Sequence, residues 1–267
     1  MKNLAVIGYG ALGKLLVSII EDRLTQDYKL RGILDIALEG EAVQVGDRKI
    51  PLYPDFKALL EDDLDLVVEI AGVGALKDYG VDILRSGRDL VVTSVGSLAD
   101  GDLLEALRKA AQEEGRKVHL TSGAIGGFDL LMTLKMMGGA QASIQSTKAP
   151  RSLNGAPYLE GKALPEDERV LAFSGNAKEA IQGFPKNTNV SVAAALATTG
   201  VEDLEVKIVS DPASQGNRHQ VVVETAQAQA KIEVLAKPDK DNPKSSVTAA
   251  WSVAALLANL ANPIQLF

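Results

Sequence analysis

The chain begins with a strand, a glycine loop and a helix, in this order. This order limits the fold more than any other feature of the sequence. Residues Asn3 to Ile7 form an apolar run that ends at a glycine, as a strand buried in a parallel sheet does. The helix that follows has its apolar residues at Leu12, Leu15, Leu16, Ile19 and Ile20. This spacing is typical of a helix that lies on a sheet.

The same unit repeats along the first half of the chain. Further strands are expected at residues 30–34, 64–70, 89–93 and 117–121, and helices at about 75–85 and 102–114. Strands that alternate with helices of this length imply right-handed crossovers and a parallel sheet with both faces covered. The sequence therefore predicts an α/β fold that begins with a Rossmann dinucleotide-binding domain over residues 1–122.

After about Ser122 the pattern changes to strands of half-exposed character mixed with a few helices. The strands are expected at residues 143–147, 170–174, 205–210, 220–225 and 230–235, and the helices at 128–137 and from about Asn189. This mixture indicates a second, α+β domain over residues 123–244. A last helix, over about 245–260, can pack back on the first domain.

Composition excludes several classes of function. The chain has 28 Lys and Arg residues against 35 Asp and Glu residues, so general binding to nucleic acid or to an anionic membrane is not expected. It has no cysteine and only two histidines, which excludes disulfides, thiolate chemistry and a histidine-rich metal centre. No signal-peptide cleavage site and no apolar run of about 20 residues is visible, so a cytoplasmic protein is expected.

The glycine loop has the pattern G-x-G-x-x-G, from Gly8 to Gly13. Such a pattern also occurs in turns that bind nothing, but here it follows a strand and opens a helix, which is the context of a dinucleotide site. Gly8 permits the tight turn, Gly10 lets a pyrophosphate approach the backbone, and Gly13 lets helix and strand pack closely. With Ala11 and Leu12, these residues would bind the phosphates through free amides at the helix start.

Asp35 stands 22 residues after Gly13, at the end of the second strand. A carboxylate there accepts hydrogen bonds from ribose hydroxyls and repels a 2′-phosphate, which favours NAD over NADP. The alternative for Asp35 is a plain turn residue.

Two more strands end in turns of small residues at the same edge, Glu69-Ile70-Ala71-Gly72 and Ser94-Val95-Gly96. Ligands of open parallel sheets bind at the carboxyl ends of the strands, so Ala71, Gly72 and Ser94 are candidate cofactor contacts. Simple tight turns are the alternative. Nothing in the local sequence marks Glu69 as a base.

The second half contains the better candidate for proton transfer. His219 stands where a loop enters a strand, and an imidazole there can handle protons near pH 7. The alternative, favoured by the local sequence alone, is a surface or edge-strand histidine with one hydrogen bond. His119 lies inside a strand pattern and is expected to be structural.

Four motifs in the second half resemble those of the L-aspartate dehydrogenase family. They are Ser122-Gly123-Ala124-Ile125-Gly126-Gly127-Phe128-Asp129, Phe184-Pro185-Lys186-Asn187-Thr188-Asn189-Val190, Asp211-Pro212 with Asn217-Arg218-His219, and Asn242-Pro243-Lys244-Ser245-Ser246. The order and spacing match over essentially the full length, with the glycine loop at the start.

The resemblance implies an enzyme in which His219 is the active-site residue and Ala124 and Asn189 contact the dinucleotide near its nicotinamide end. It also implies a substrate and dimerisation role for the second domain, a homodimer, and NAD as cofactor, with NADP also accepted by some members. The implied reaction is the oxidative deamination of L-aspartate to iminosuccinate, which hydrolyses to oxaloacetate and ammonia, or the reverse reductive amination. His219 would take a proton from the substrate ammonium or from water, or bind a substrate carboxylate.

A substrate with two carboxylates needs cationic and hydrogen-bonding partners. The candidates in or beside the motif loops are Lys148, Lys244, Asn187 and Ser245, with Arg151, Lys186 and Arg218 as further cations. For each cation, an ordinary solvated charge is the alternative.

The chain departs from the family pattern at two places. Residues 225–229 read Thr-Ala-Gln-Ala-Gln where the family usually has a turn with glycine, and Ser245 stands for the usual threonine. The turn must differ, and substrate choice or oligomer contacts can differ with it. Two rival hypotheses therefore stay open: a related dehydrogenase or imine reductase for another amino or oxo diacid, and a non-catalytic NAD-binding protein.

Overall fold

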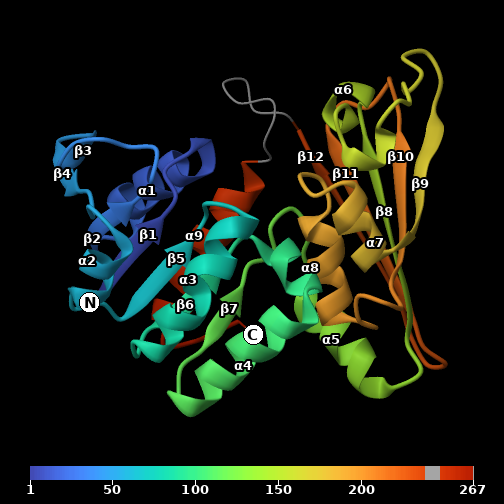
Figure 1. Ribbon diagram of the computed structural model, residues 1–267. Coiled ribbons are helices and arrows are strands. Elements are labelled where there is room, and N and C mark those ends of the chain that lie inside the picture. Colours follow the sequence, from blue (N-terminus) through green and yellow to red (C-terminus); the bar gives the residue numbers. More distant parts are fainter. Residues whose placement is uncertain (238–246, 267) are drawn as a thin grey trace. The chain divides into compact units, whose positions relative to one another are not determined.

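The computed structural model describes residues 1–237 and 247–266 (Figure 1). It divides into two compact units. The first consists of Met1–Thr121 together with Ala249–Phe267, and the second of Ser122–Thr248.

The first unit contains a sheet of five strands in the order β2-β1-β5-β6-β7. Their bounds are Lys2–Ile7 (β1), Tyr28–Leu34 (β2), Leu66–Glu69 (β5), Asp89–Val92 (β6) and Val118–Leu120 (β7). All the pairings are parallel, which confirms the predicted α/β fold. The chain goes from β1 to β2 in one direction and then returns to the other side of β1, so a switch point lies between β1 and β5.

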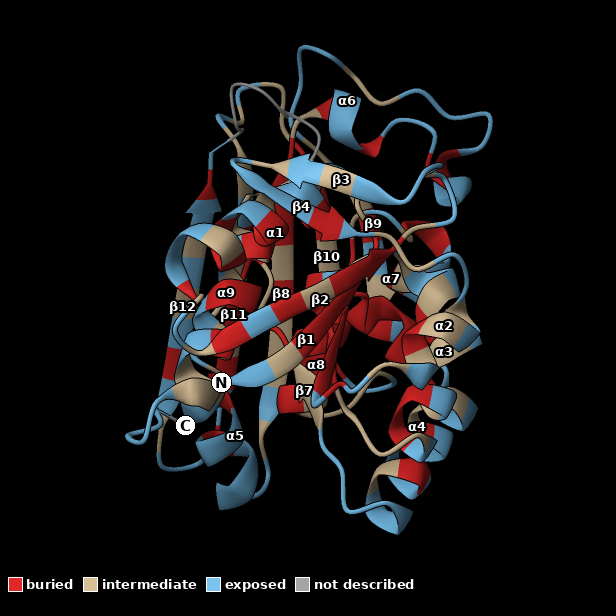
Figure 2. Cartoon of the chain, turned by 90° about the vertical axis from the view of Figure 1, so that its left-hand side faces the viewer, coloured by how far each residue is buried: buried red, intermediate tan, exposed pale blue. Residues whose placement is uncertain are grey.

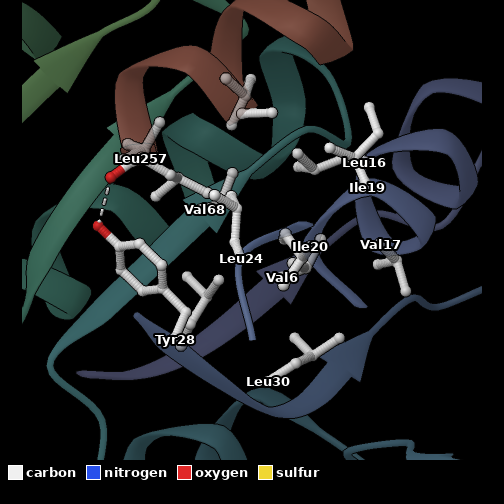
Figure 3. Packing of buried hydrophobic residues seen from close by; sticks show 14 of the residues in the cluster. Val6, Leu16, Val17, Ile19, Ile20, Leu24, Tyr28, Leu30, Val68 and Leu257 are labelled. Atoms are coloured by element: carbon white, nitrogen blue, oxygen red, sulfur yellow. Dashed lines mark hydrogen bonds between the residues drawn. The ribbon is translucent and has the colours of Figure 1, made fainter. Parts of the chain in front are cut away.

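Helices cover both faces of this sheet. The helices α1 (Ala11–Arg23) and α9 (Thr248–Ala261) pack on the face that carries Leu4, Val6 and Val68. Figure 3 shows Val6 and Val68 among the side chains of this cluster. The side chains of this cluster include Leu16, Ile20, Val253 and Leu257, and the Tyr28 hydroxyl donates a hydrogen bond of 2.8 Å to the Leu257 carbonyl. On the other face, α3 (Val73–Arg85) meets α4 (Gly101–Glu113) and Leu90 at Gly80. The last helix of the chain thus belongs to the core of the first unit.

Some short elements of the first unit were not expected from the sequence. A hairpin of β3 (Ala42–Val45) and β4 (Arg48–Pro51) and the helix α2 (Phe56–Glu61) lie between β2 and β5, and a 3-10 helix η1 (Val95–Ala99) follows β6. Figure 2 shows β3 at the exposed surface, whereas β1 is buried over most of its length. Elements this short and this exposed carry little hydrophobic periodicity, which is the signal that predicts the longer ones.

The second unit contains a mixed sheet in the order β12-β11-β8-β10-β9. The bounds are Gln141–Lys148 (β8), Val170–Asn176 (β9), Glu205–Ser210 (β10), Asn217–Glu224 (β11) and Gln229–Ala236 (β12). Only β8 and β10 pair in parallel. The strand β11 therefore lies inside the sheet, between β8 and β12.

Helices pack on one face of this second sheet. The helix α5 (Phe128–Met137) contacts β11, α7 (Ala177–Gly183) contacts β9 and β10, and α8 (Asn189–Ala197) contacts α5 and α7. The short helices α6 (Pro150–Leu153) and η2 (Pro157–Leu159) follow β8. The covered face carries buried residues from three neighbouring strands, among them Ile144, Val206 and Val221. In the described part of the chain, no helix is long and apolar enough to cross a membrane.

Candidate functional site

The carboxyl ends of the strands in the first unit form one edge. The strand register pairs Ile7 with Leu34 on one side and with Glu69 on the other, and Glu69 with Val92. The loops that follow these residues therefore leave the sheet side by side. They include the glycine loop, Asp35, Ala71, Gly72 and Ser94, so the structure brings the predicted cofactor residues of the first unit to one edge.

The glycine loop is closely packed on one side and open on the other. Gly8 has a φ of +105°, and a Cβ there would lie 2.7 Å from the Ala71 Cα. A Cβ on Gly13 would collide with the Gly8 carbonyl oxygen, whereas a Cβ on Gly10 would meet no atom within 4 Å. Gly10 is the N-cap of α1, where the first amides have no acceptor within the helix. This open space beside free amides fits the pyrophosphate of a dinucleotide.

Asp35 fixes the glycine loop from the neighbouring strand. Its Oδ2 accepts a hydrogen bond of 2.6 Å from the Tyr9 amide, and its Oδ1 accepts one of 2.9 Å from the Ala37 amide. Each carboxylate oxygen can accept a second bond, so Asp35 can still bind a ribose hydroxyl.

Glu69 links the two other strand-end turns. Its Oε1 accepts hydrogen bonds from the amides of Ala71 and Gly72, both at 2.9 Å, and from the Ser94 hydroxyl at 2.7 Å. Its Oε2 accepts a bond of 3.0 Å from the Ser94 amide. This role was not predicted, because Ser94, which supplies two of the four donors, lies 25 positions away in the sequence.

In the second unit, His219 lies on the covered face of the sheet and is only 2% exposed. It pairs across the strands with Ser146, and its Nδ1 lies 2.8 Å from the Ser146 Oγ. The interior position of β11 and this burial make the surface or edge-strand alternative for His219 wrong. Ser146 was not predicted, because strand register is not visible in a single sequence.

Lys148 follows Ser146 by two residues on β8 and so lies on the same face as His219. It is 7% exposed, and no described carboxylate forms an ion pair with it. Burial lowers the pKa of Lys148 to about 8. Burial and the nearby Lys148 charge lower the pKa of His219 to about 3, so the imidazole is neutral at pH 7. The face therefore holds a buried cation that lacks a described partner, next to a neutral histidine.

Three of the residues expected to contact the nicotinamide end or the substrate lie next to helix starts, Ala124 before α5 and Asn187 and Asn189 at the start of α8. Thr188 is fully buried, and its hydroxyl donates to the Phe184 carbonyl at 2.8 Å, which leaves Asn187 and Asn189 on either side of this anchor. Ala124 is 8% exposed and lies in the loop before α5. None of the described hydrogen bonds joins the side chains of Asn187 or Asn189 to His219.

The other predicted cations differ from Lys148. Arg218 forms an ion pair of 3.0 Å with Glu233, and Arg151 and Lys186 are exposed. Lys244 and Ser245 lie outside the described residues. His119 is half-buried, with its Nε2 3.8 Å from an Asp89 oxygen. Among the described residues, no group of acidic residues, histidines or cysteines could hold a metal.

The turn at residues 225–229, which lacks glycine, is held by hydrogen bonds of Thr225. The Thr225 hydroxyl accepts a hydrogen bond of 3.0 Å from the Ala228 amide, and the Thr225 amide donates one of 2.8 Å to the Ala228 carbonyl. Thr225 follows His219 by six positions, and at about 3.3 Å per residue along a strand this is a distance of about 20 Å. The altered turn is therefore remote from the imidazole.

Two sequence profiles match the chain. Residues 8–121 match the NAD-binding domain of homoserine dehydrogenase, and residues 129–260 match the C-terminal domain of aspartate dehydrogenase. L-Aspartate dehydrogenase from Methanospirillum hungatei is 35% identical over 264 residues, which cover 99% of this chain and 98% of the relative. The enzyme of the same name from Acinetobacter baylyi is 34% identical and covers 100% of both chains.

Two solved structures also align with the chain over almost its full length. Aspartate dehydrogenase from Thermotoga maritima aligns over 100% of both chains with a TM-score of 0.79 and 25% identity. An archaeal homoserine dehydrogenase in complex with NADPH aligns over 99% of both chains with a TM-score of 0.58 and 11% identity, which indicates a shared fold.

Proposed function

The chain belongs to the L-aspartate dehydrogenase family, and we propose that it oxidises L-aspartate with NAD as the preferred acceptor. L-Aspartate loses a hydride from Cα and a proton from its ammonium group, and becomes the iminium form of iminosuccinate. Water then adds to this carbon and ammonium leaves, which gives oxaloacetate. The bound nicotinamide supplies the chemistry of hydride acceptance.

The observation that carries the substrate class is the buried Lys148 without a described counter-ion. A buried ammonium group is costly unless it is paired, and a substrate carboxylate would complete the pair. Burial is the larger cause of the lowered pKa of His219 and the Lys148 charge is the smaller one, so a carboxylate bound to Lys148 would remove part of this lowering. Substrate binding would thus prepare the imidazole for proton transfer.

His219 is the proposed base. In the proposed tautomer, Nδ1–H donates to Ser146 Oγ, 2.8 Å away, and Nε2 accepts a proton from the substrate ammonium. Ser146 then keeps the ring oriented while the proton moves. Asn187, together with Lys244 and Ser245 of the last motif, is proposed to bind the rest of the diacid, and Ala124 and Asn189 the nicotinamide end of the cofactor.

The cofactor preference is supported by Asp35. Its carboxylate can bind the ribose hydroxyls and would repel a 2′-phosphate. Gly8, Gly10, Ala11, Leu12 and Gly13 are proposed to hold the pyrophosphate, with Ala71, Gly72 and Ser94 along the neighbouring turns. The altered turn at Thr225 gives no support to a different substrate, because it is remote from His219.

A homodimer and a cytoplasmic location are also proposed. The helix α5 carries four exposed apolar side chains, which support a contact with a second protein chain. They are Leu130, Met132, Met136 and Met137, of which Met136 is 85% exposed. Light scattering after size exclusion tests the dimer, and fractionation of the source cell tests the location.

Reduction of NAD and NADP by the purified protein at mildly alkaline pH tests the main proposal. L-Aspartate should support turnover, and D-aspartate, L-glutamate and L-alanine serve as controls. Turnover with a different diacid alone, or NADH binding without any turnover, would contradict the proposed substrate.

A further inference from the structure

We infer that Glu69 is a positioning residue for the dinucleotide, because its carboxylate holds the two turns beside the glycine loop in place. This inference rests on the proposed function, in which those turns border the cofactor. Glu69 ends β5 and is 1% exposed. It receives four hydrogen bonds, from Ala71, Gly72 and both donors of Ser94.

These four bonds hold the turns at the strand-end edge that is proposed to bind the cofactor, and they do not join elements of the core. A Cβ on Gly8 would lie 2.7 Å from the backbone nitrogen of Ala71, so the turn after β5 is in direct contact with the glycine loop. Gly13 in turn packs on the Gly8 carbonyl. A shift of the turn that Glu69 holds would therefore move the loop that is proposed to bind the pyrophosphate.

The chemistry of the four partners requires a carboxylate at this position. All four are N–H or O–H donors, and an ionised carboxylate offers two oxygens that only accept. A glutamine in the same place would direct an NH₂ group at one of these donors, and an aspartate is one methylene shorter. Since no described cation pairs with Glu69, its burial depends on these hydrogen bonds.

Glu69→Gln tests the inference, with Asp62→Asn as the matched control. Asp62 is another carboxylate of the first unit with several donors, Arg31, Tyr53 and the Asp63 amide, but it precedes β5. Fluorescence titration with NADH gives the Kd, and initial rates with L-aspartate give the KM for NAD and kcat. The Tm of each variant measures the structural cost.

Glu69→Gln should raise the Kd for NADH about tenfold, the loss expected when charge-assisted hydrogen bonds are broken, with kcat at saturating cofactor changed less than about twofold. Asp62→Asn should lower the Tm and leave the Kd unchanged. An unchanged Kd in Glu69→Gln, or an equal rise in both variants, overturns the inference.

Ser94→Ala covers the case in which Glu69→Gln does not fold. It removes one of the four bonds and should raise the Kd for NADH about threefold, whereas an unchanged Kd overturns the inference. NADH binding needs no substrate. A wild-type protein that binds NADH but does not oxidise L-aspartate therefore disproves the proposed substrate, while the Kd values still decide the role of Glu69.

Discussion

The two units present their polar groups in opposite ways. In the first unit, the strand-end edge consists mainly of backbone amides and glycines, which Asp35 and Glu69 hold in position. In the second unit, the side chains of His219, Ser146 and Lys148 lie buried on a sheet face. The first arrangement depends on loop conformation, and the second on the register between strands. Substitutions at the strand-end edge should therefore impair cofactor affinity, and substitutions of His219, Ser146 or Lys148 should impair turnover or substrate affinity.

His219→Asn should give the largest effect and the sharpest separation between the units. Loss of the proton acceptor should lower kcat by about 10²- to 10⁴-fold, the usual contribution of general base catalysis. The Kd for NADH, measured by fluorescence titration, should stay within about twofold of the wild-type value. A variant with full activity would remove His219 from the mechanism.

Lys148→Met should weaken substrate binding and at the same time stabilise the fold. The loss of a buried charge-assisted bond should raise the KM for L-aspartate by about 100-fold. The pKa of Lys148 is lowered to about 8 from 10.5, so its charged form costs up to about 3 kcal/mol of folding free energy below pH 8. The variant should unfold at a higher temperature at pH 7. A lower Tm would contradict the proposed unpaired charge.

The same lysine predicts a pH dependence in the wild-type protein. Between pH 8 and 10.5 the unfolded chain binds more protons at Lys148, so the free energy of unfolding should rise with pH, relative to Lys148→Met. Over the same range the KM for L-aspartate should rise, because the lysine loses the charge that binds the carboxylate. Paired denaturation curves and initial rates at several pH values check both slopes.

Gly10→Ala and Gly13→Ala should separate cofactor binding from stability within the first unit. A Cβ on Gly10 meets open space, so the Tm should stay unchanged while the Kd for NADH rises about tenfold through contact with the pyrophosphate. A Cβ on Gly13 collides with the Gly8 carbonyl, so this variant should also lose about 1–3 kcal/mol of stability. Equal melting temperatures for the two variants would contradict this packing.

Asp35→Ser should have the smallest effect. Removal of the carboxylate should improve the use of NADP relative to NAD by about fivefold, since repulsion of the 2′-phosphate is lost. The ratio of kcat/KM for the two cofactors measures this change. A constant ratio would show that Asp35 does not select the cofactor.

The two regions also differ in how far the sequence predicts them, because the first is formed by neighbours in the chain and the second by the register between strands. The glycine loop and its flanking strand and helix are local, so Gly8 to Gly13 and the α/β fold could be predicted, and the helix expected over residues 128–137 has those bounds in the structure. The pairing of Ser146 with His219 joins residues 73 positions apart, and Glu69 reaches Ser94, which follows the neighbouring strand β6. Such contacts arise from register and sheet order, which one sequence does not contain. The exposed hairpin of β3 and β4 was missed because its strands are too short to show a period.

The return of α9 to the first unit has a consequence for the order in which the protein is made. The ribosome completes β1 to β7 early, but Val253 and Leu257, which cover one face of that sheet, emerge only after the whole second unit. The second unit is continuous and can fold as soon as it leaves the exit tunnel, whereas the sheet face with Leu4, Val6 and Val68 is covered only by α1 until α9 is made. The nascent chain thus passes through a stage in which the later-made unit is complete while the earlier-made one still lacks one helix of its core.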